Sequence, residues 1–134
     1  MNNLSLGFIG VGLMGLSFIR RLSYLNYKID AYDKNLKKLE PLKEISNIKL
    51  NQNVSEISKN NDIIISCLDK TESVEEVVFG IDGIVNNAHE NTIILDLSTT
   101  LANETINFAN KLNKKTGASW IDAPVSGGPD KALE

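Results

Sequence analysis

The sequence predicts an α/β protein of the doubly wound class, in which helices cover both faces of a parallel β-sheet. Short, β-rich apolar runs alternate with longer amphipathic stretches about six times along the chain, without tandem hairpin signals. One run, Ile63-Ile64-Ile65, is continuously apolar, as is typical of a strand buried on both faces. The 134 residues are enough for one domain of ordinary size. These observations favour successive βαβ units within a single domain, residues 1–134.

The first half of the chain is expected to contain three strands, each followed by a helix. In order, these are strand 4–9, helix 13–25, strand 29–32, helix 35–44, strand 48–50 and helix 54–59. The strands are short aliphatic or β-branched runs, and the helices carry apolar residues three and four positions apart. Asn35 can cap the second helix, whereas Pro41 is expected to break or restart it.

The second half repeats the alternation and ends in a loop. Its predicted elements are strand 62–68, helix 71–78, strand 92–97, helix 102–115 and strand 120–123. Residues 124–129 begin and end with proline and are predicted to be loop. On helix 71–78, the glutamates Glu72, Glu75 and Glu76 are expected to face solvent.

Composition and charge exclude several function classes. The net charge of −3 argues against nucleic acid or an anionic membrane as a partner. The single cysteine, Cys67, cannot form an internal disulfide, and no cluster of ligand residues suggests a metal site. The lone histidine, His89, is expected at the surface. Residues 1–8 lack a signal-peptide pattern and no apolar run approaches about 18 residues, so a cytoplasmic protein is expected.

A glycine loop stands between the first predicted strand and helix. It reads Gly10-Val11-Gly12-Leu13-Met14-Gly15 and has the G-x-G-x-x-G spacing of dinucleotide-binding turns. Gly10 would allow the tight turn, Gly12 a close approach of the backbone to a pyrophosphate, and Gly15 close helix packing. The pyrophosphate would meet free N–H groups at the helix start. The alternative is a turn that is glycine-rich for its own geometry alone.

Asp33 supports the dinucleotide interpretation because it closes the second strand 18 residues after Gly15. A carboxylate about 20 residues beyond the loop can accept hydrogen bonds from the adenosine ribose hydroxyls. It would also repel a 2′-phosphate, which favours NAD over NADP as the cofactor. Lys34, Lys37 and Lys38 can partly offset that repulsion. A plain turn residue is the alternative for Asp33.

Polar residues also follow the later strands, at the sheet edge where ligands of such folds bind. They lie in segments 67–69, 96–100 and 122–129. In the last of these, Ser126 offers a hydroxyl, and Gly127 and Gly128 offer uncovered backbone N–H groups. Together these groups can hold a small carboxylate.

These motifs resemble the β-hydroxyacid dehydrogenase family, which includes 3-hydroxyisobutyrate dehydrogenase and is related to 6-phosphogluconate dehydrogenase. Segments 7–15, 96–99 and 122–128 carry the resemblance, in the family's order. It implies a Rossmann domain of an NAD-dependent oxidoreductase that transfers a hydride between the cofactor and a small β-hydroxy acid or aldehyde acid. A dinucleotide-sensing module without catalysis is the alternative, although it would not need a substrate-carboxylate site.

The resemblance also implies roles for individual residues. Beyond the glycine loop, Asp33 and Lys34, the implied cofactor contacts are Leu68, Asp69, Ser73 and Thr99. The implied substrate contacts are Ser98, Ser126, Gly127 and Gly128. Asp69 stands where the family usually has proline, and Ser73 where some members have asparagine.

The family's catalytic lysine and helical second domain would lie beyond Glu134, so no catalytic residue is expected within this chain. The resemblance therefore implies a cofactor domain that is inactive alone. The intact enzyme is expected to be a homo-oligomer through the helical part.

Overall fold

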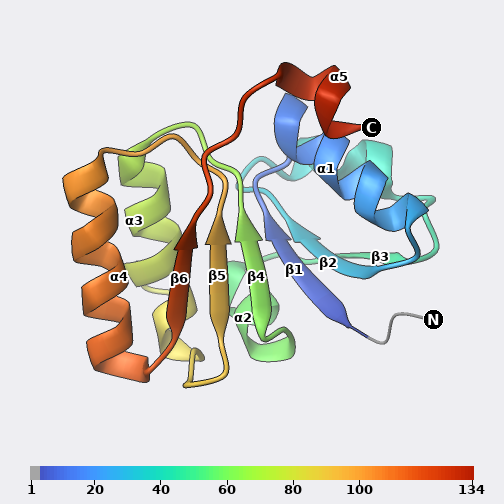
Figure 1. The fold of residues 1–134 in the computed structure, drawn as a ribbon. Coiled ribbons are helices and arrows are strands. Elements are labelled where there is room, and N and C mark those ends of the chain that lie inside the picture. The colour runs from blue at the N-terminus through green and yellow to red at the C-terminus, as the bar shows by residue number, and fades with distance from the viewer. Residues whose placement is uncertain (1–3) are drawn as a thin grey trace.

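The computed structural model describes residues 4–134, so the first three residues of the predicted domain lie outside the described residues. It contains a six-stranded parallel sheet in the order β3-β2-β1-β4-β5-β6, shown in Figure 1. The strands are β1 (Ser5–Ile9), β2 (Lys28–Tyr32), β3 (Ile48–Leu50), β4 (Ile63–Ser66), β5 (Ile93–Asp96) and β6 (Ser119–Asp122). The strand order reverses between β1 and β4, which makes this the topological switch point of a doubly wound sheet. The predicted fold class is confirmed.

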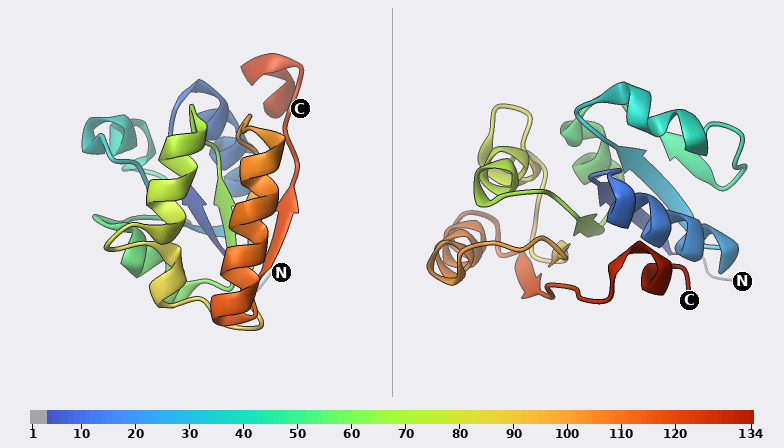
Figure 2. Two further views of the ribbon diagram at one scale, coloured as in Figure 1. Left: turned by 90° about the vertical axis from the view of Figure 1, so that its left-hand side faces the viewer. Right: turned by 90° about the horizontal axis from the view of Figure 1, so that it is seen from above.

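Helices cover the sheet on both faces (Figure 2). They are α1 (Leu13–Tyr24), α2 (Val54–Asn60), α3 (Thr71–Phe79), α4 (Ala102–Thr116), α5 (Gly128–Ala132) and the 3-10 helices η1 (Leu36–Leu42) and η2 (Ile84–Asn86). Among residues 4–134, no helix has the length and apolar character needed to cross a membrane.

Each face of the sheet has its own hydrophobic core. On one face, side chains of α2, α3 and α4 pack on β1, β4 and β5, with Ile57, Val74 and Leu112 fully buried. On the other face, α1 and η1 pack on β1 and β2, with Ile19 and Leu42 at their centre. Burial on both faces explains why the central strands are continuously apolar.

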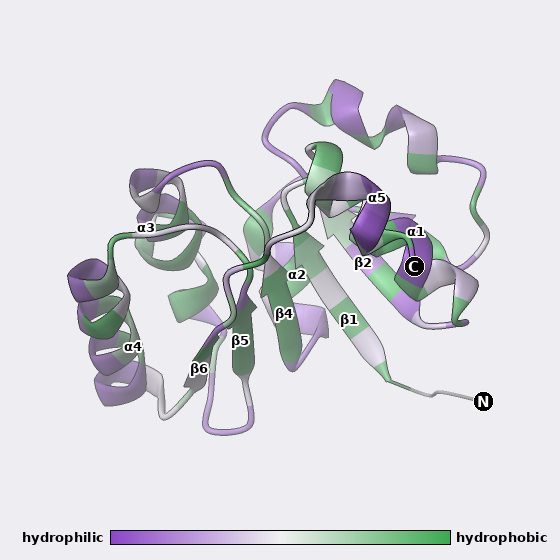
Figure 3. Ribbon diagram, turned by 45° about the horizontal axis from the view of Figure 1, so that its top comes forward, coloured by the Kyte–Doolittle hydropathy of each residue, from purple (hydrophilic) through white to green (hydrophobic). Residues whose placement is uncertain are grey.

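The α1 face is covered less completely over β4, β5 and β6. Figure 3 shows these strands as apolar ribbons with no helix in front of them. Leu95 is only partly buried there, and Ile121 is 49% exposed.

Most predicted boundaries differ from the observed ones by one or two residues, but two predictions were wrong. The segment 35–44 is a 3-10 helix, Leu36–Leu42, rather than an α-helix. Pro41 lies inside it, where its missing N–H prevents α-helical pairing, and the Asn35 side chain accepts a hydrogen bond from the N–H of Lys37.

The second correction concerns 124–129, which is loop only up to Gly127. Helix α5 begins at Gly128, and Pro129 lies in its first turn, where a missing N–H costs nothing. The chain after β6 crosses the carboxyl edge of the sheet and brings α5 against α1 (Figure 1). Ala132 is buried in α5, whereas Lys131 and Leu133 on either side of it are exposed.

Candidate functional site

A groove of about 910 Å³ opens at the carboxyl edge of the sheet, at the switch point between β1 and β4. The β1–α1 turn, the end of β2 and the start of α3 form its walls. Its lining includes Gly10, Gly12, Leu13, Met14, Gly15, Tyr32, Asp33, Lys34, Asn35, Lys38, Cys67, Leu68, Asp69, Lys70, Glu72, Ser73 and Glu76.

The three glycines of the β1–α1 turn have different surroundings. Gly10 has a φ of +102°, and a Cβ there would overlap the carbonyl group of Cys67. A Cβ on Gly15 would overlap the carbonyl oxygen of Gly10. A Cβ on Gly12 would meet nothing within 4 Å, because that position faces the open groove. Gly10 and Gly15 thus allow the backbone to pack closely, whereas Gly12 leaves space for a ligand.

The start of α1 offers hydrogen-bond donors to that space. Gly12 is the N-cap residue, has no side chain to cap the helix, and its carbonyl accepts from the N–H of Leu16. The first turn holds no acidic residue. The first N–H groups of a helix lack partners within the helix, and the helix dipole places partial positive charge there. This end of α1 therefore suits an anion such as a pyrophosphate.

Asp33 ties the β1–α1 turn to the end of β2. Asp33 is 9% exposed, and its carboxylate accepts hydrogen bonds from the N–H of Val11, at 2.7 Å, and of Asn35, at 2.8 Å. Asp33 therefore fixes the shape of the turn. Each carboxylate oxygen accepts one of these bonds and keeps further acceptor capacity toward the groove.

Charges of both signs line the groove. Lys34 and Lys38 lie on the β2 side, and Asp69 precedes α3 on the β4 side. The Ser73 hydroxyl donates to Asp69 at 2.8 Å and holds the pKa of that carboxyl below its usual value. Glu72 and Glu76 are exposed, as expected. They also line the groove, a location that the sequence analysis did not predict.

Two further groups of the groove have shifted pKa values. Burial raises the pKa of the Tyr32 hydroxyl, and the nearby Asp33 and Asp82 add to the shift. Burial also raises the pKa of the Cys67 thiol, with a contribution from Asp96.

The structure places the predicted contacts after β5 and β6 outside the groove lining. Ser98 is 2% exposed, and its Oγ accepts a hydrogen bond from the N–H of Leu68 at 2.8 Å. Thr99 is exposed just beyond it. Ser126 and Gly127 are exposed in the segment before α5. Gly127, with a φ of +107°, is the N-cap residue of α5, and Gly128 is the first residue of that helix.

The groove thus brings together the glycine loop, Asp33, Lys34, Leu68, Asp69 and Ser73, with Val11 contributing its backbone. Sequence reasoning did not single out Tyr32 or Lys70 as lining residues, and it named Lys38 only as a cation near Asp33. Their place in the sequence could have indicated this location, because they lie at or after the ends of β2 and β4, beside the switch point.

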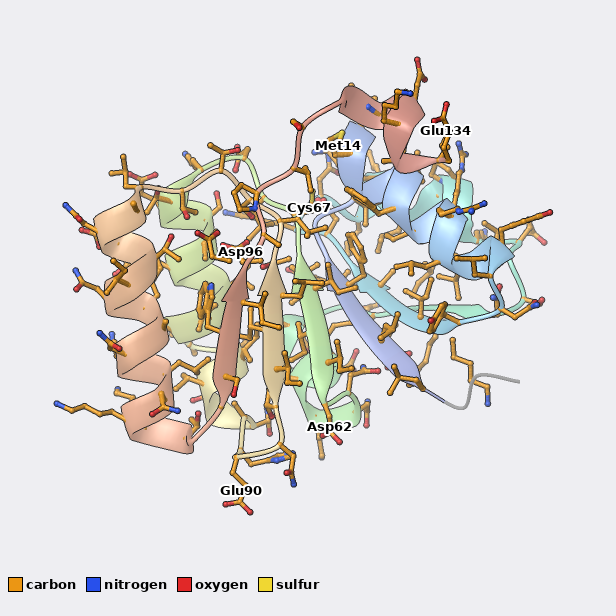
Figure 4. The ribbon with its side chains drawn as sticks, in the orientation of Figure 1. Met14, Asp62, Cys67, Glu90, Asp96 and Glu134 are labelled. Carbon is orange, nitrogen blue, oxygen red and sulfur yellow. The ribbon has the colours of Figure 1, made fainter. Side chains whose placement is uncertain are left out.

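The lone histidine lies at the opposite end of the sheet, where the strands begin. His89 Nε2 lies 3.2 Å from Asp62 Oδ1, and both side chains are exposed. Figure 4 shows Asp62 at the far end of the sheet from Met14 and Cys67. His89 is therefore remote from the groove. Residues 4–134 contain no group of three His, Cys, Asp or Glu side chains able to hold a metal ion.

Replacing Gly15 with alanine is expected to destabilise the fold. The new methyl group would overlap the Gly10 carbonyl, so α1 must shift away from β1, at a cost of about 2 kcal/mol or more. Urea unfolding monitored by circular dichroism measures this, with exposed Ala102→Gly at the start of α4 as a helix control. Unchanged stability would contradict the packing role of Gly15.

A family model for the NAD binding domain of 6-phosphogluconate dehydrogenase matches residues 5–134. An uncharacterised oxidoreductase, YkwC, of Bacillus subtilis is 32% identical over 92% of this chain and 42% of its own length. The 2-hydroxy-3-oxopropionate reductase of Escherichia coli is 30% identical over 98% and 44%. A probable mitochondrial 3-hydroxyisobutyrate dehydrogenase of Dictyostelium discoideum is 30% identical over 92% and 38%. The chain spans less than half the length of each relative.

Solved structures share the fold. Psf3 in complex with NADP+ and 2-OPP superposes with a TM-score of 0.88 and 25% identity, over 96% of this chain and 45% of that one. An imine reductase variant of Myxococcus stipitatus in complex with NAD+ gives 0.85 and 17%, over 96% and 43%. Proteins of this fold therefore include one solved with each form of the dinucleotide.

Proposed function

The chain belongs to the family of NAD-binding domains of 6-phosphogluconate dehydrogenase, and from that premise we propose that its switch-point groove binds a nicotinamide dinucleotide for an oxidoreductase acting on a small β-hydroxy acid or aldehyde acid. The observation that carries the proposal is Gly12, which begins a helix, faces open space and leaves the helix N–H groups uncovered. The groove volume of about 910 Å³ is within the usual range for small-molecule sites.

Each part of the groove then has a defined task. The N-terminal turn of α1 binds the pyrophosphate, and Asp33 accepts hydrogen bonds from the adenosine ribose over β2. The other half of the dinucleotide lies over β4, against Leu68, Asp69 and Ser73. When bound, the nicotinamide supplies the hydride-transfer chemistry, while the protein orients the reactants.

The substrate is proposed to bind near the carboxyl ends of β5 and β6. The resemblance of segments 96–99 and 122–128 to the family supports this location, as do the dehydrogenase and reductase names of the relatives. Thr99 and Gly127 are exposed after these strands, and Gly127 and Gly128 both have positive φ values and carry no side chain beside their own N–H groups. Such groups suit a small carboxylate. The intact enzyme is proposed to be a homo-oligomer.

Isothermal titration calorimetry with NADH tests the binding proposal directly. We expect saturable binding with one site per chain, and competition by ADP-ribose, which shares the adenosine and pyrophosphate contacts. Absence of binding by either compound to a folded chain would overturn the proposed function.

NADH is expected to bind more tightly than NADPH, by on the order of 1 kcal/mol, or roughly fivefold. The reason is the Asp33 carboxylate at the adenosine end, which repels a 2′-phosphate. Calorimetric titration of both cofactors measures the ratio, and Lys34→Ala and Lys38→Ala should weaken NADPH more than NADH. Equal or inverted affinities in the wild-type chain would mean that these lysines outweigh Asp33.

A further inference from the structure

A buried carboxylate lies behind the β4 side of the groove. Asp96, the last residue of β5, is fully buried, and its neighbour in the register of β4 is Ser66. Asp96 Oδ1 accepts hydrogen bonds from the Ser66 hydroxyl, at 2.9 Å, and from the N–H of Ser98, at 3.1 Å. Its Oδ2 is buried and has no partner among the described residues.

The hydrogen bonds continue from Asp96 to the wall of the groove. Asp96 holds the backbone of Ser98, and the Ser98 hydroxyl accepts from the N–H of Leu68 at 2.8 Å. Ser98 is itself 2% exposed, so this link is sheltered from water. Leu68 lines the groove, whereas Asp96 and Ser98 lie behind it. Figure 4 shows Asp96 and Cys67 at the carboxyl ends of neighbouring strands.

Leu68 is the first residue after β4 whose N–H is not bound by a backbone carbonyl of the neighbouring strand. The N–H of Cys67 still pairs with the carbonyl of Ile9, at 2.9 Å, and the N–H of Leu97 with that of Ser66, at 2.8 Å. The next N–H in the β4 chain, that of Leu68, is bound by a side chain instead. The N–H of Leu68, between β4 and α3, is thus bound by Ser98, whose own N–H is bound by Asp96.

We propose that Asp96 is a positioning residue for the cofactor groove, which acts through Ser98 to hold Leu68 and the start of α3 where the half of the dinucleotide opposite the adenosine binds. This inference rests on the proposed function. The adenosine half has separate supports, Gly12 and Asp33, on the far side of the switch point. Loss of the Asp96 network therefore weakens one half of the site and spares the other.

Burial raises the pKa of Asp96, although hydrogen bonds from Ser98 and Ser66 oppose the shift, and Asp122 on the neighbouring strand adds to it. The network works through geometry in either protonation state, because the Oδ1 atom accepts both bonds. Asparagine keeps an acceptor oxygen at that position and is the conservative variant, whereas alanine removes it.

The test compares two ligands, NADH and ADP-ribose, by calorimetry on the full chain. Ser98→Ala and Asp96→Ala are each expected to weaken NADH binding by about fivefold or more, as loss of a buried hydrogen bond would. Both variants should bind ADP-ribose within about twofold of wild type, since the β1–α1 turn is unchanged. Asp96→Asn should restore most of the NADH affinity.

Matched controls come from a buried serine and a partly buried aspartate away from the groove. Ser58 in α2 is 4% exposed and accepts from Asn87, and Asp30 in β2 accepts from Asn61. Ser58→Ala and Asp30→Asn are expected to leave both affinities unchanged. Should Asp96→Ala fail to fold, Ser98→Ala carries the test by itself.

Three results would overturn the inference. They are unchanged NADH affinity in folded Ser98→Ala, equal loss of NADH and ADP-ribose affinity, and failure of Asp96→Asn to bind better than Asp96→Ala. A wild-type chain that binds neither ligand would instead remove the proposed function on which the inference rests.

Discussion

Replacing Gly12 with valine is expected to weaken NADH binding by about a hundredfold or more while the fold survives. No protein atom lies within 4 Å of a Cβ at this position, so valine would carry its side chain into the space proposed for the pyrophosphate. The φ of −77° and ψ of −166° at Gly12 are open to any residue, so the backbone does not resist the change. Alanine should have a smaller effect, about tenfold.

Thermal melts and calorimetry separate the two consequences. Without ligand, Gly12→Val should lose less than about 1 kcal/mol, the cost of a poor N-cap residue. Ala102→Val places the same side chain at the exposed start of α4 and should leave NADH binding unchanged. If Gly12→Val bound NADH with wild-type affinity, the glycine loop would be a turn and the central argument for the site would fail.

The contrast between Gly12 and Gly15 shows what the sequence can and cannot predict. The spacing of the glycines, between a strand and a helix, predicted separate roles for them. The surroundings of Gly10 and Gly15 show the close packing, whereas the approach of a pyrophosphate to Gly12 stays a prediction. The hydrogen bond that Asp33 accepts from the N–H of Val11 was not predictable. It depends on how closely β1 and β2 approach at the edge of the sheet, and no local pattern encodes that distance.

Asp96 and α5 are two further features that depend on contacts between distant parts of the sequence and that local patterns did not predict. An aspartate at the end of the apolar run Ile93-Ile94-Leu95 was a visible signal, but only the register with Ser66 shows that it is buried in a network. The segment 124–129 carries two prolines and two glycines, which locally favour a loop. Packing against α1 overrides that preference after Gly127, as tertiary contacts often do for short helices.

The 134-residue chain is expected to bind NADH yet to show no measurable oxidation of 3-hydroxy acids by NAD. A positioned general base contributes about 10²–10⁴ to such a rate, and segments 96–100 and 122–129, after β5 and β6, contain neither lysine nor histidine. His89 lies at the opposite end of the sheet, where the strands begin, beside Asp62. Lys131 is exposed in α5, where its Nζ lies 3.3 Å from Glu134, and it does not line the groove.

The assay follows NADH absorbance with a panel of 3-hydroxy acids and NAD, and in reverse with aldehyde acids and NADH. The Escherichia coli relative, with 2-hydroxy-3-oxopropionate, serves as the positive control. Lys70, which lines the groove beside α3, is the lysine best placed to substitute for a missing base. It is the N-cap residue of α3 and is exposed, whereas a general base must be held within hydrogen-bond reach of the proton that it removes. Robust turnover that is lost in Lys70→Ala or Lys131→Ala would show that the chain carries its own base, and it would overturn the view that these residues only bind and orient the dinucleotide.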